Sequence, residues 1–405
     1  MSDSENGCET KLVFQGNFTQ QEAVPEAAIE AAIAVMRGGR LHRYNLASGE
    51  DGEVAALERE FAEWQGCKFC LAVTSGGQAM QIALRAAGVC HGDPVLTNAF
   101  TLAPVPGAIN IVGAQPVLVE IDENLRLDLS DLDEKADASG ARILLLSHMR
   151  GHLCDMDKLI EITDRRGIRV IEDCAHTMGS TWNGVRSGNF GFAACFSTQT
   201  YKHMNSGEGG FLTADDPDFM ARATVLSGSY MLFERNGAGP DTKHFARAKY
   251  QTPNGSARMD ALRAAILRLQ LLNLGESIAR WNRRYEVVAK RLAKSNRIVL
   301  PARPEAESMV GSSIQFRVPG LDAEGCETFL ARVAARGVEL KWFGQTEPQG
   351  FTSAHQSWAY IAPQNLPQTD AVLATLFDMR LPLTFSEEDC DLIGRIIREV
   401  AEAID

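Results

Sequence analysis

The stretch CFSTQTYKHMNSGEGGFL, from Cys195 to Leu212, ends an apolar run, places Lys202 beside Tyr201 and then enters a glycine-rich turn. A lysine usually keeps its ammonium group in water, because burying that charge is costly. A lysine inside such a run therefore either packs its aliphatic stem or carries out chemistry. Desolvation and nearby positive charge would lower its pKa toward the free amine that attacks carbonyl carbons, so we treat Lys202 as a candidate nucleophile.

Short apolar runs alternate with helical segments along the first half of the chain. The runs are bounded by Gly, Pro or Asp and lie at residues 70–75, 93–98, 115–122, 141–148, 168–175 and 192–198. Between them, apolar side chains recur at helical spacing, for example over residues 52–66, 77–88 and 155–167. Strands that alternate with helices predict an α/β fold with a largely parallel sheet covered on both faces. The uncharged segment 94–119 contains four prolines, so we expect loops and strands there and no membrane span.

The last third of the chain predicts a long helix and a smaller unit. Residues 259–295 keep a helical apolar period, with a break expected at Gly275. The smaller α+β unit is predicted from segments 312–318, 326–343 and 386–404. Its last helix has a capping signal at Ser386. A chain of 405 residues is longer than a single hydrophobic core usually supports, so we expect two domains. The N-terminal arm and the large domain are expected over residues 1–257, and the connecting helix and the small domain over residues 258–405.

The composition limits the partners and the compartment of the protein. With 40 Lys and Arg against 52 Asp and Glu, the net charge is −12, which argues against general binding to nucleic acid or anionic membranes. The nine cysteines form no secreted disulfide framework, and the polar start MSDSENGCETK lacks the features of a signal peptide, so we expect a cytoplasmic protein. Cys67 and Cys70 have metal-like spacing without a second pair nearby, so we predict buried hydrophobes and no metal site.

A phosphate site is predicted where the first strand meets the next helix. The sequence VTSGGQAMQIAL, from Val73 to Leu84, indicates a strand, a turn at Ser75, Gly76 and Gly77, and a helix. The free N–H groups and the dipole of the helix N-terminus then face the turn and favour an anion. Glycine at such a turn also relieves steric crowding, so this feature alone leaves both interpretations open.

Acidic and polar side chains are predicted at the same edge of the sheet. In RVIEDCAHTMGS the strand ends in Asp173, with His176 three residues further on. Ligands of α/β sheets bind at the carboxyl ends of the strands, where a carboxylate can hold a proton on a heteroaromatic nitrogen. A helix cap or a salt bridge is the structural alternative for a lone aspartate. Because alternate strand residues share a face, Ser197 and Gln199 are expected to face the same ligand.

The phosphate cradle, the strand-end acid and the partly buried lysine are, in this order, the parts that an enzyme using pyridoxal phosphate (PLP) needs. The chain resembles the DegT-like sugar aminotransferases, a family of fold-type-I PLP enzymes, over nearly its whole length. The resemblance rests on residues 52–66, 73–84, 113–122, 169–180, 196–212 and 381–393. It implies a large domain with a mainly parallel seven-stranded sheet between helices, a smaller C-terminal α+β domain, and a homodimer with shared active sites.

The resemblance also implies roles for single residues. Lys202 would form the Schiff base with PLP, Asp173 would pair with the pyridine nitrogen, and His176 would lie beside the ring or its phenolic oxygen. Phe100 falls in the segment that supplies an aromatic plate against the ring, with Leu102 as the alternative. The other expected cofactor-binding residues of this chain are Ser75, Gly76, Gly77, Gln78, Ser197 and Gln199.

The chain departs from the family pattern in two places. Members usually donate an asparagine across the dimer interface to the cofactor phosphate; here the sequence is PNGSARM, in which Ser256 matches that position and Asn254 is a near substitute. Arg150 follows the fourth strand where many members have a tyrosine, and it indicates either an acidic substrate or a surface ion pair. We expect substrate choice to lie at Arg150, in segments 38–45 and 341–351 and in the basic segment 243–258, with Arg43, Tyr44, Arg247 and Lys249 as candidate contacts.

The leading hypothesis is transfer of an amino group from an amino acid, with glutamate as the expected donor, to a keto sugar or a related carbonyl acceptor. Two alternatives keep PLP: an elimination reaction driven by Lys202, or transfer to a non-sugar acidic substrate. A non-catalytic PLP-binding regulator is disfavoured by the intact Lys202 and Asp173. A dehydrogenase is disfavoured because no G-x-G-x-x-G follows the first strand. Substrate identity depends on the site and not on the fold, so the sequence leaves the acceptor open.

Overall fold

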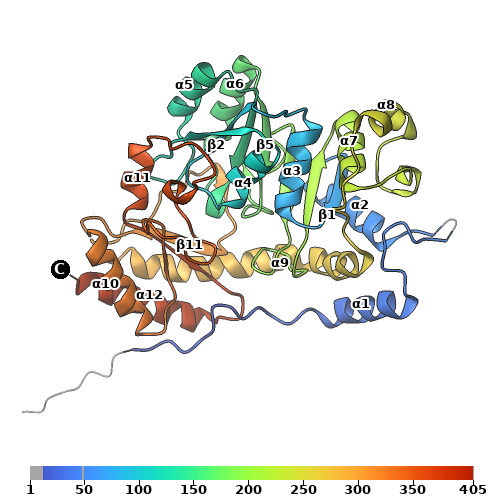
Figure 1. The fold of residues 1–405 in the computed structure, drawn as a ribbon. Coiled ribbons are helices and arrows are strands. Elements are labelled where there is room, and N and C mark those ends of the chain that lie inside the picture. Colours follow the sequence, from blue (N-terminus) through green and yellow to red (C-terminus); the bar gives the residue numbers. More distant parts are fainter. Residues whose placement is uncertain (1–11, 48–49, 405) are drawn as a thin grey trace, which may run out of the picture.

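A computed structural model describes residues 12–47 and 50–404; the polar start of the chain, including Cys8, lies outside this part. A sheet of seven strands organises the larger part of the molecule (Figure 1). Its strands are β1 (Phe69–Val73), β2 (Pro94–Asn98), β3 (Gln115–Val119), β4 (Ile143–Ser147), β5 (Arg169–Asp173), β8 (Ala193–Ser197) and β9 (Gly210–Ala214). They lie in the order β1-β9-β8-β5-β4-β2-β3, and only β9 runs antiparallel to its neighbours. This topology confirms the predicted α/β fold with a mainly parallel sheet.

Alternate residues of each strand face opposite helical layers. The helices are α2 (Glu53–Gln65), α3 (Gly76–Ala86), α4 (Pro104–Ile111), α5 (Leu129–Ser139), α6 (Met156–Arg166) and α7 (Pro217–Ser227). In β4, Ile143 and Leu145 join the core formed with α3, α4 and α7, whereas Leu144 and Leu146 join the core formed with α5 and α6. Burial on both faces explains why these strands are almost continuously apolar in sequence.

Helix α4 lies inside the uncharged segment 94–119, where we had expected loops and strands only. Pro104 and Pro106 stand in its first turn, where a missing N–H costs nothing because those N–H groups have no partner within a helix. Proline therefore marks the start of this helix and does not exclude it. Among the described residues, no helix combines the length and the apolar character needed to cross a membrane.

Helix α9 (Ala261–Leu292) runs below the large sheet into the smaller part of the molecule (Figure 1). It begins at Asp260, whose carboxylate accepts the backbone N–H of Arg263. The predicted break at Gly275 is wrong, because the helix continues through it; glycine costs about 1 kcal/mol relative to alanine in a helix interior, which so long a packed helix tolerates. Helix α1 (Glu26–Gly38) packs along α9. The domain boundary proposed between residues 257 and 258 falls just before α9 and stays a prediction.

A small antiparallel sheet lies at the far end of α9. Its strands, in the order β11-β13-β12, are β11 (Ser313–Arg317), β13 (Leu376–Arg380) and β12 (Lys341–Trp342). One face carries apolar side chains that pack on α9, α10 (Ala323–Ala334) and α12 (Glu387–Glu402). The other face carries polar residues. Ser386 caps α12 as predicted, in a capping box with Asp389.

The remaining short elements complete the chain. Helices α8 (Phe245–Gln251) and α11 (Pro367–Leu373) lie at opposite sides of the molecule in Figure 1. Strands β6 (Thr181–Trp182), β7 (Val185–Arg186) and β10 (Glu307–Ser308) form a third sheet. The turn η1 (Met149–Gly151) follows β4 directly. This turn brings Arg150 toward the small sheet.

Candidate active site

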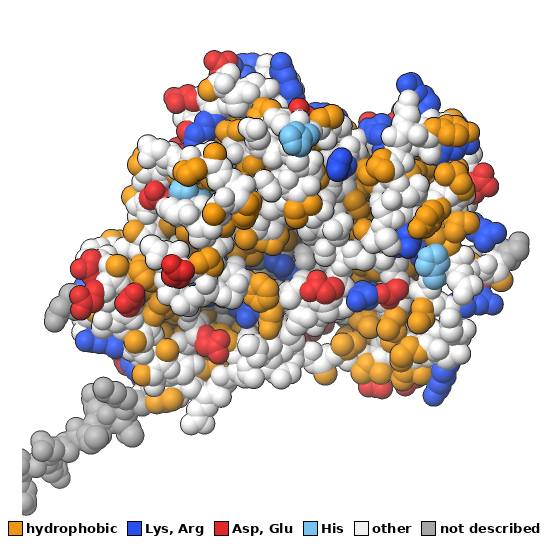
Figure 2. Space-filling view, in the orientation of Figure 1, with side chains coloured by type: hydrophobic (Ala, Val, Ile, Leu, Met, Phe, Trp, Pro, Cys, Tyr) orange, Lys and Arg blue, Asp and Glu red, His pale blue; other side chains and the backbone are white. Residues whose placement is uncertain are grey.

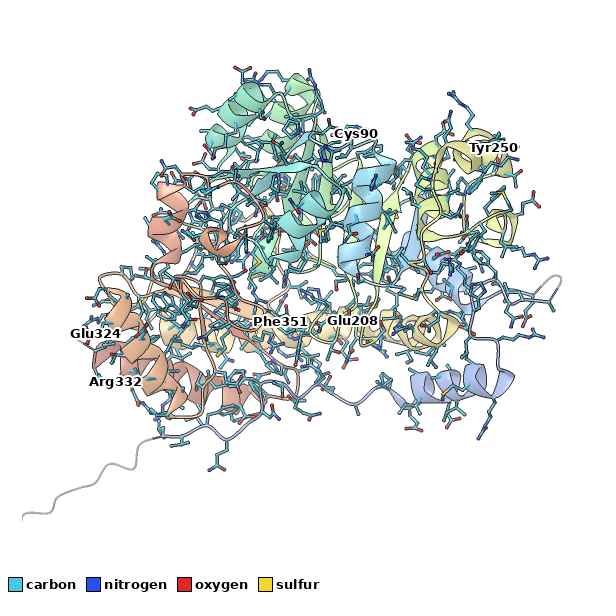
Figure 3. The ribbon with its side chains drawn as sticks, in the orientation of Figure 1. Cys90, Glu208, Tyr250, Glu324, Arg332 and Phe351 are labelled. Atoms are coloured by element: carbon cyan, nitrogen blue, oxygen red, sulfur yellow. The ribbon has the colours of Figure 1, made fainter. Side chains whose placement is uncertain are left out.

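A cavity of about 360 Å³ lies between the carboxyl edge of the large sheet and the polar face of the small sheet. The last residues of β4, β5 and β8, which are Ser147, Asp173 and Ser197, all line it. A hollow in the centre of the face drawn in Figure 2 contains Lys or Arg side chains. Glu208 and Phe351, which also line the cavity, lie in the middle of the same face in Figure 3. The cavity therefore occupies the position where α/β sheets bind ligands.

The turn before α3 forms one end of the cavity. Ser75 caps this helix by accepting the N–H of Gln78 at 3.1 Å, which leaves Gly76 and Gly77 at the cavity wall with N–H groups that no helical carbonyl accepts. Close packing explains Gly76 and the neighbouring Gly210 but not Gly77: a Cβ on Gly76 would lie 2.9 Å from the Cβ of Ser197, and one on Gly210 would lie 2.6 Å from the Gly76 nitrogen. Gln78 does not line the cavity.

Lys202 lies in the turn after β8, with its side chain partly buried in the cavity wall. Its backbone N–H donates to the carbonyl of Gln199, which also lines the cavity. Its Nζ lies 3.1 Å from Nε2 of His176. Burial, followed by the positive charge of Arg150, lowers the pKa of Lys202 to about 7, although the Asp173 carboxylate opposes this shift. A lysine amine in this state is free at neutral pH in a large fraction of molecules.

Asp173 and His176 flank this amine. The Asp173 carboxylate accepts the backbone N–H of Ala175 at 3.1 Å and the hydroxyl of Ser147 at 3.3 Å. Burial raises the pKa of Asp173 above its ordinary value, against the effect of Lys202 and of that N–H. Burial and then the charge of Lys202 lower the pKa of His176 well below its ordinary value. His176 is therefore neutral at pH 7, and its Nε2 accepts a hydrogen bond from the lysine amine or donates one to it, depending on the tautomer.

Phe100 is not at the cavity wall. Its ring packs edge to face on Phe343, 5.0 Å away, inside an apolar cluster next to α11. Leu102 lines the cavity instead, so the structure places the alternative residue there. The ring of Phe100 is 1% exposed, and the backbone turn after β2 directs it into the core.

Arg43 and Tyr44 are likewise absent from the cavity wall. Both side chains are buried, and the Arg43 guanidinium donates to the two carboxylate oxygens of Glu58 at 2.8 and 2.9 Å. Arg43 and Tyr44 also bond the side chain of Asn236. A buried arginine needs such a carboxylate partner, so a structural ion pair takes the place of the predicted substrate contact.

The other predicted contacts lie on the surface, away from the cavity of their own chain. Asn254 accepts the N–H of Tyr230, and Ser256 accepts from Arg258. Arg247 and Lys249 project from α8, and neither lines the cavity. Whether these residues reach the cavity of a second copy stays a prediction.

Several cavity residues were not named as site residues from sequence, and Lys341, Phe351 and Arg380 are among them. Lys341 and Phe351 fall at the two ends of segment 341–351, which sequence had assigned to substrate choice. Arg380 lies outside the segments that sequence assigned to substrate choice. The one feature of the sequence that points to it is its position two residues after Asp378 in an otherwise apolar strand, which places both charged side chains on one face of the sheet. Arg150, which sequence did name, pairs with Asp378 in a buried contact of 2.7 Å.

One buried cluster in the described chain has metal-ligand chemistry: His148, Glu172 and Cys174. Its carboxylate is already saturated, because Glu172 bonds His148 at 2.9 Å and accepts backbone N–H groups from the loop before β8. Burial also raises the pKa of the Cys174 thiol well above its ordinary value, which disfavours the thiolate that metals bind. The cluster braces the loop against β5.

The residues at the cavity fit PLP. The Gly76 and Gly77 N–H groups suit a phosphate, and the Asp173 carboxylate uses only part of its hydrogen-bonding capacity within the chain. The Lys202 amine, with its lowered pKa, suits an aldehyde. These three groups line one cavity, and they are the kinds of group that such a cofactor needs.

Comparison with known proteins identifies the family. The chain belongs to the DegT/DnrJ/EryC1/StrS aminotransferase family, which matches residues 25–398. It is 30% identical over 295 residues to the 3-amino-5-hydroxybenzoate synthase of Amycolatopsis mediterranei, covering 71% of this chain and 72% of that protein. It is 31% identical over 348 residues to the dTDP-3-amino-3,4,6-trideoxy-alpha-D-glucose transaminase of Streptomyces venezuelae, covering 82% of this chain and 85% of that protein.

The solved structures agree on the fold. The crystal structure of 3-amino-5-hydroxybenzoic acid synthase matches with a TM-score of 0.81 at 24% identity, over 97% of this chain and 100% of that chain. The family consists of PLP-dependent aminotransferases. The protein is therefore an aminotransferase of this PLP-dependent family, as the sequence motifs predicted.

Proposed function

We propose that this chain binds PLP through Lys202 and moves an amino group from glutamate to a keto sugar or a related carbonyl acceptor. The observation that carries the proposal is the Lys202 amine, which lies 3.1 Å from a neutral His176 in the cavity that Asp173 also lines. Of the two relatives named above, the Streptomyces venezuelae transaminase is named for an amino sugar and the Amycolatopsis mediterranei synthase for an amino-hydroxybenzoate, which supports a keto sugar or a related carbonyl acceptor. When bound, PLP supplies an electron sink that stabilises the carbanion formed when an amino acid loses its α-proton.

The residues of the chain would prepare and assist this chemistry. The N–H groups of Gly76 and Gly77 would bind the phosphate, and Asp173 would hold positive charge on the ring nitrogen of the cofactor. Nζ of Lys202 would accept and return the substrate proton, because its pKa of about 7 matches the working pH. His176 would orient that amine through the contact between Nε2 and Nζ.

We further propose a cytoplasmic homodimer in which Asn254 or Ser256 reaches the cofactor phosphate of the partner subunit. Both residues lie near the surface of the chain and outside its own cavity, as a contribution to a second copy requires. Cross-linking at low protein concentration, followed by mass measurement, tests the dimer. A monomer with full activity would contradict it.

The function is tested by following both halves of the reaction. Purified protein is supplied with PLP and glutamate, and the 2-oxoglutarate released per subunit is measured. We expect about one equivalent without an acceptor, and continued release when a suitable keto sugar or other carbonyl acceptor is added. Release of water or another leaving group from the acceptor, without consumption of glutamate, would instead identify an elimination reaction.

A further inference from the structure

The small sheet contributes two basic side chains to the cavity that have no carboxylate partner. Lys341 and Arg380 both line the cavity, and neither forms a salt bridge with any residue of the described chain. The guanidinium of Arg380 lies over the ring of Tyr201, 3.7 Å from its centre. Basic side chains at a cavity wall are unusual without a carboxylate partner, because a partly buried charge is costly unless it is paired. The absence of a carboxylate partner for Lys341 and Arg380 therefore needs an explanation.

The sheet register explains why the nearby acid does not neutralise them. Asp378 stands opposite Lys341 across β12 and β13 and opposite Gln315 across β11 and β13, and Arg380 follows on the same face. Gln315 donates to one oxygen of Asp378 at 2.8 Å, and the other oxygen lies 2.7 Å from Nη2 of Arg150. Asp378 is thus committed to Arg150, which leaves Lys341 and Arg380 without a carboxylate partner on this face; the other carboxylates at the cavity wall are Asp173, at the end of β5, and the exposed Glu208.

This arrangement is costly without a ligand. Burial and then the charge of Arg150 lower the pKa of Lys341 to about 8, and Arg380 adds to this shift. Arg150 has a left-handed backbone, with φ of 54°, which is rare for any residue other than glycine, asparagine or aspartate. Its Nε is buried and has no hydrogen-bond partner among the described residues. Backbone strain and an unpartnered buried polar atom are found where a site needs them, and an anion would balance the charge of Lys341 and Arg380.

We infer that Lys341 and Arg380, with Arg150 behind them, bind a carboxylate of the acceptor, which is then a small carboxylate-bearing carbonyl compound and not a nucleotide-linked sugar. The inference rests on the proposed function, because it assigns the anion to the carbonyl substrate of the same cavity. Leu102, Met149 and Phe351 offer apolar contacts for its carbon skeleton.

The position of the cations favours a carboxylate over a nucleotide diphosphate. Arg150, Lys341 and Arg380 line the same cavity as the Lys202 amine. A diphosphate attached to a sugar would sit several bonds from the reacting carbon, whereas a carboxylate can sit beside it. The donor amino acid also carries a carboxylate into this cavity, so the test must separate donor from acceptor.

The test measures binding to the PLP-loaded enzyme by calorimetry, with benzoate, benzamide and thymidine diphosphate as probes. Each is measured before treatment with glutamate and again after treatment and desalting, because the treated form is the one that meets the acceptor. We expect benzoate to bind the treated form about tenfold or more tightly than benzamide does. Lys341→Gln and Arg380→Gln should each weaken benzoate about tenfold, while PLP content and the matched surface control Lys294→Gln stay unchanged. Lys341→Arg and Arg380→Lys should retain most of the affinity.

Several results would overturn the inference. Equal binding of benzoate and benzamide would remove the carboxylate preference. Loss of thymidine diphosphate binding in both variants, with benzoate unaffected, would assign the cations to a nucleotide. Benzoate binding confined to the untreated form would assign them to the donor. If the wild-type enzyme forms no PLP band and releases no 2-oxoglutarate, the proposed function is wrong, and so is the inference about its acceptor. If the reaction with glutamate is normal but any of the three results above is obtained, only the inference is wrong.

Discussion

The two walls of the cavity differ in how their polar groups are satisfied. On the wall formed by the large sheet, each reactive group has a partner within the site: Lys202 has His176, and Asp173 has Ser147. On the wall formed by the small sheet, Lys341 and Arg380 have no carboxylate partner among the described residues. The difference suggests a division of tasks. On the first wall, the groups proposed for cofactor chemistry already have partners within the chain. On the second wall, the two basic side chains would gain a partner of opposite charge only when an anion binds.

This division predicts that changes to the two walls have different consequences. A change on the large-sheet wall should reduce the rate of every reaction the enzyme performs, whichever substrate is supplied. A change on the small-sheet wall should reduce the affinity for anionic ligands and leave cofactor binding intact. The following variants test this contrast.

The largest effect is expected for Lys202→Ala. Turnover should fall about 10⁴-fold, because both the amine that holds the cofactor and the proton carrier are lost. The exposed Lys294→Ala serves as a matched control and should keep full turnover. Steady-state release of 2-oxoglutarate measures both. Turnover of Lys202→Ala within tenfold of wild type would show that another lysine holds the cofactor and carries the proton.

The second effect is expected for Asp173→Asn. An amide cannot stabilise positive charge on the cofactor ring, so the glutamate half-reaction should slow about 10²- to 10³-fold while much of the PLP remains bound. Stopped-flow absorbance gives the rate, and the visible band gives the PLP content. Asp137→Asn, on the exposed surface of α5, is the control. An unchanged half-reaction rate would remove Asp173 from the mechanism.

A pH profile separates the two cavity lysines. Only the neutral amine attacks an aldehyde, and the pKa of Lys202 is about 7 whereas that of Lys341 is about 8. The rate at which PLP-free protein takes up PLP should therefore rise about tenfold per pH unit below 7 and level off above it. A rate that keeps rising to pH 8 before it levels off would point to Lys341.

The smallest effect is expected outside both walls, for Arg247→Gln combined with Lys249→Gln. These side chains lie on α8, from which they would attract an anionic substrate of a second copy across a dimer interface. The apparent KM for the acceptor should rise a few-fold, more at low salt than at high salt. The KM for glutamate should change less. No change at low salt would leave the segment as a solvated surface.

Sequence predicted the large-sheet wall better than the rest, and the reason is physical. Strand ends of a parallel sheet meet at one edge, so Asp173, Ser197 and Lys202 could be placed together from local patterns alone. Strand β9 was not among the predicted runs, because it begins inside a glycine-rich segment that resembles a turn. The direction of the Phe100 ring depends on one backbone turn, which spacing does not determine.

Long-range contacts account for the other differences. The partners of Arg43 are Glu58 and Asn236, which lie 15 and 193 residues away, so sequence could not show that its charge is used inside the core. Arg380 reaches the cavity only because the small sheet packs against the edge of the large one. Segment 341–351 was assigned to substrate choice as a whole, whereas the register of β12 with β13 is what selects Lys341 within it.

The most direct test of the account asks which cavity lysine holds the cofactor. The PLP-loaded protein is reduced with borohydride and digested, and the peptide that carries the reduced cofactor is identified by mass spectrometry. We predict that the label is on Lys202, since its Nζ lies 3.1 Å from Nε2 of His176 in the cavity that Asp173, at the end of β5, also lines. A label on Lys341, or on any other lysine, would contradict the assignment of chemistry to the large-sheet wall and of anion binding to the small-sheet wall.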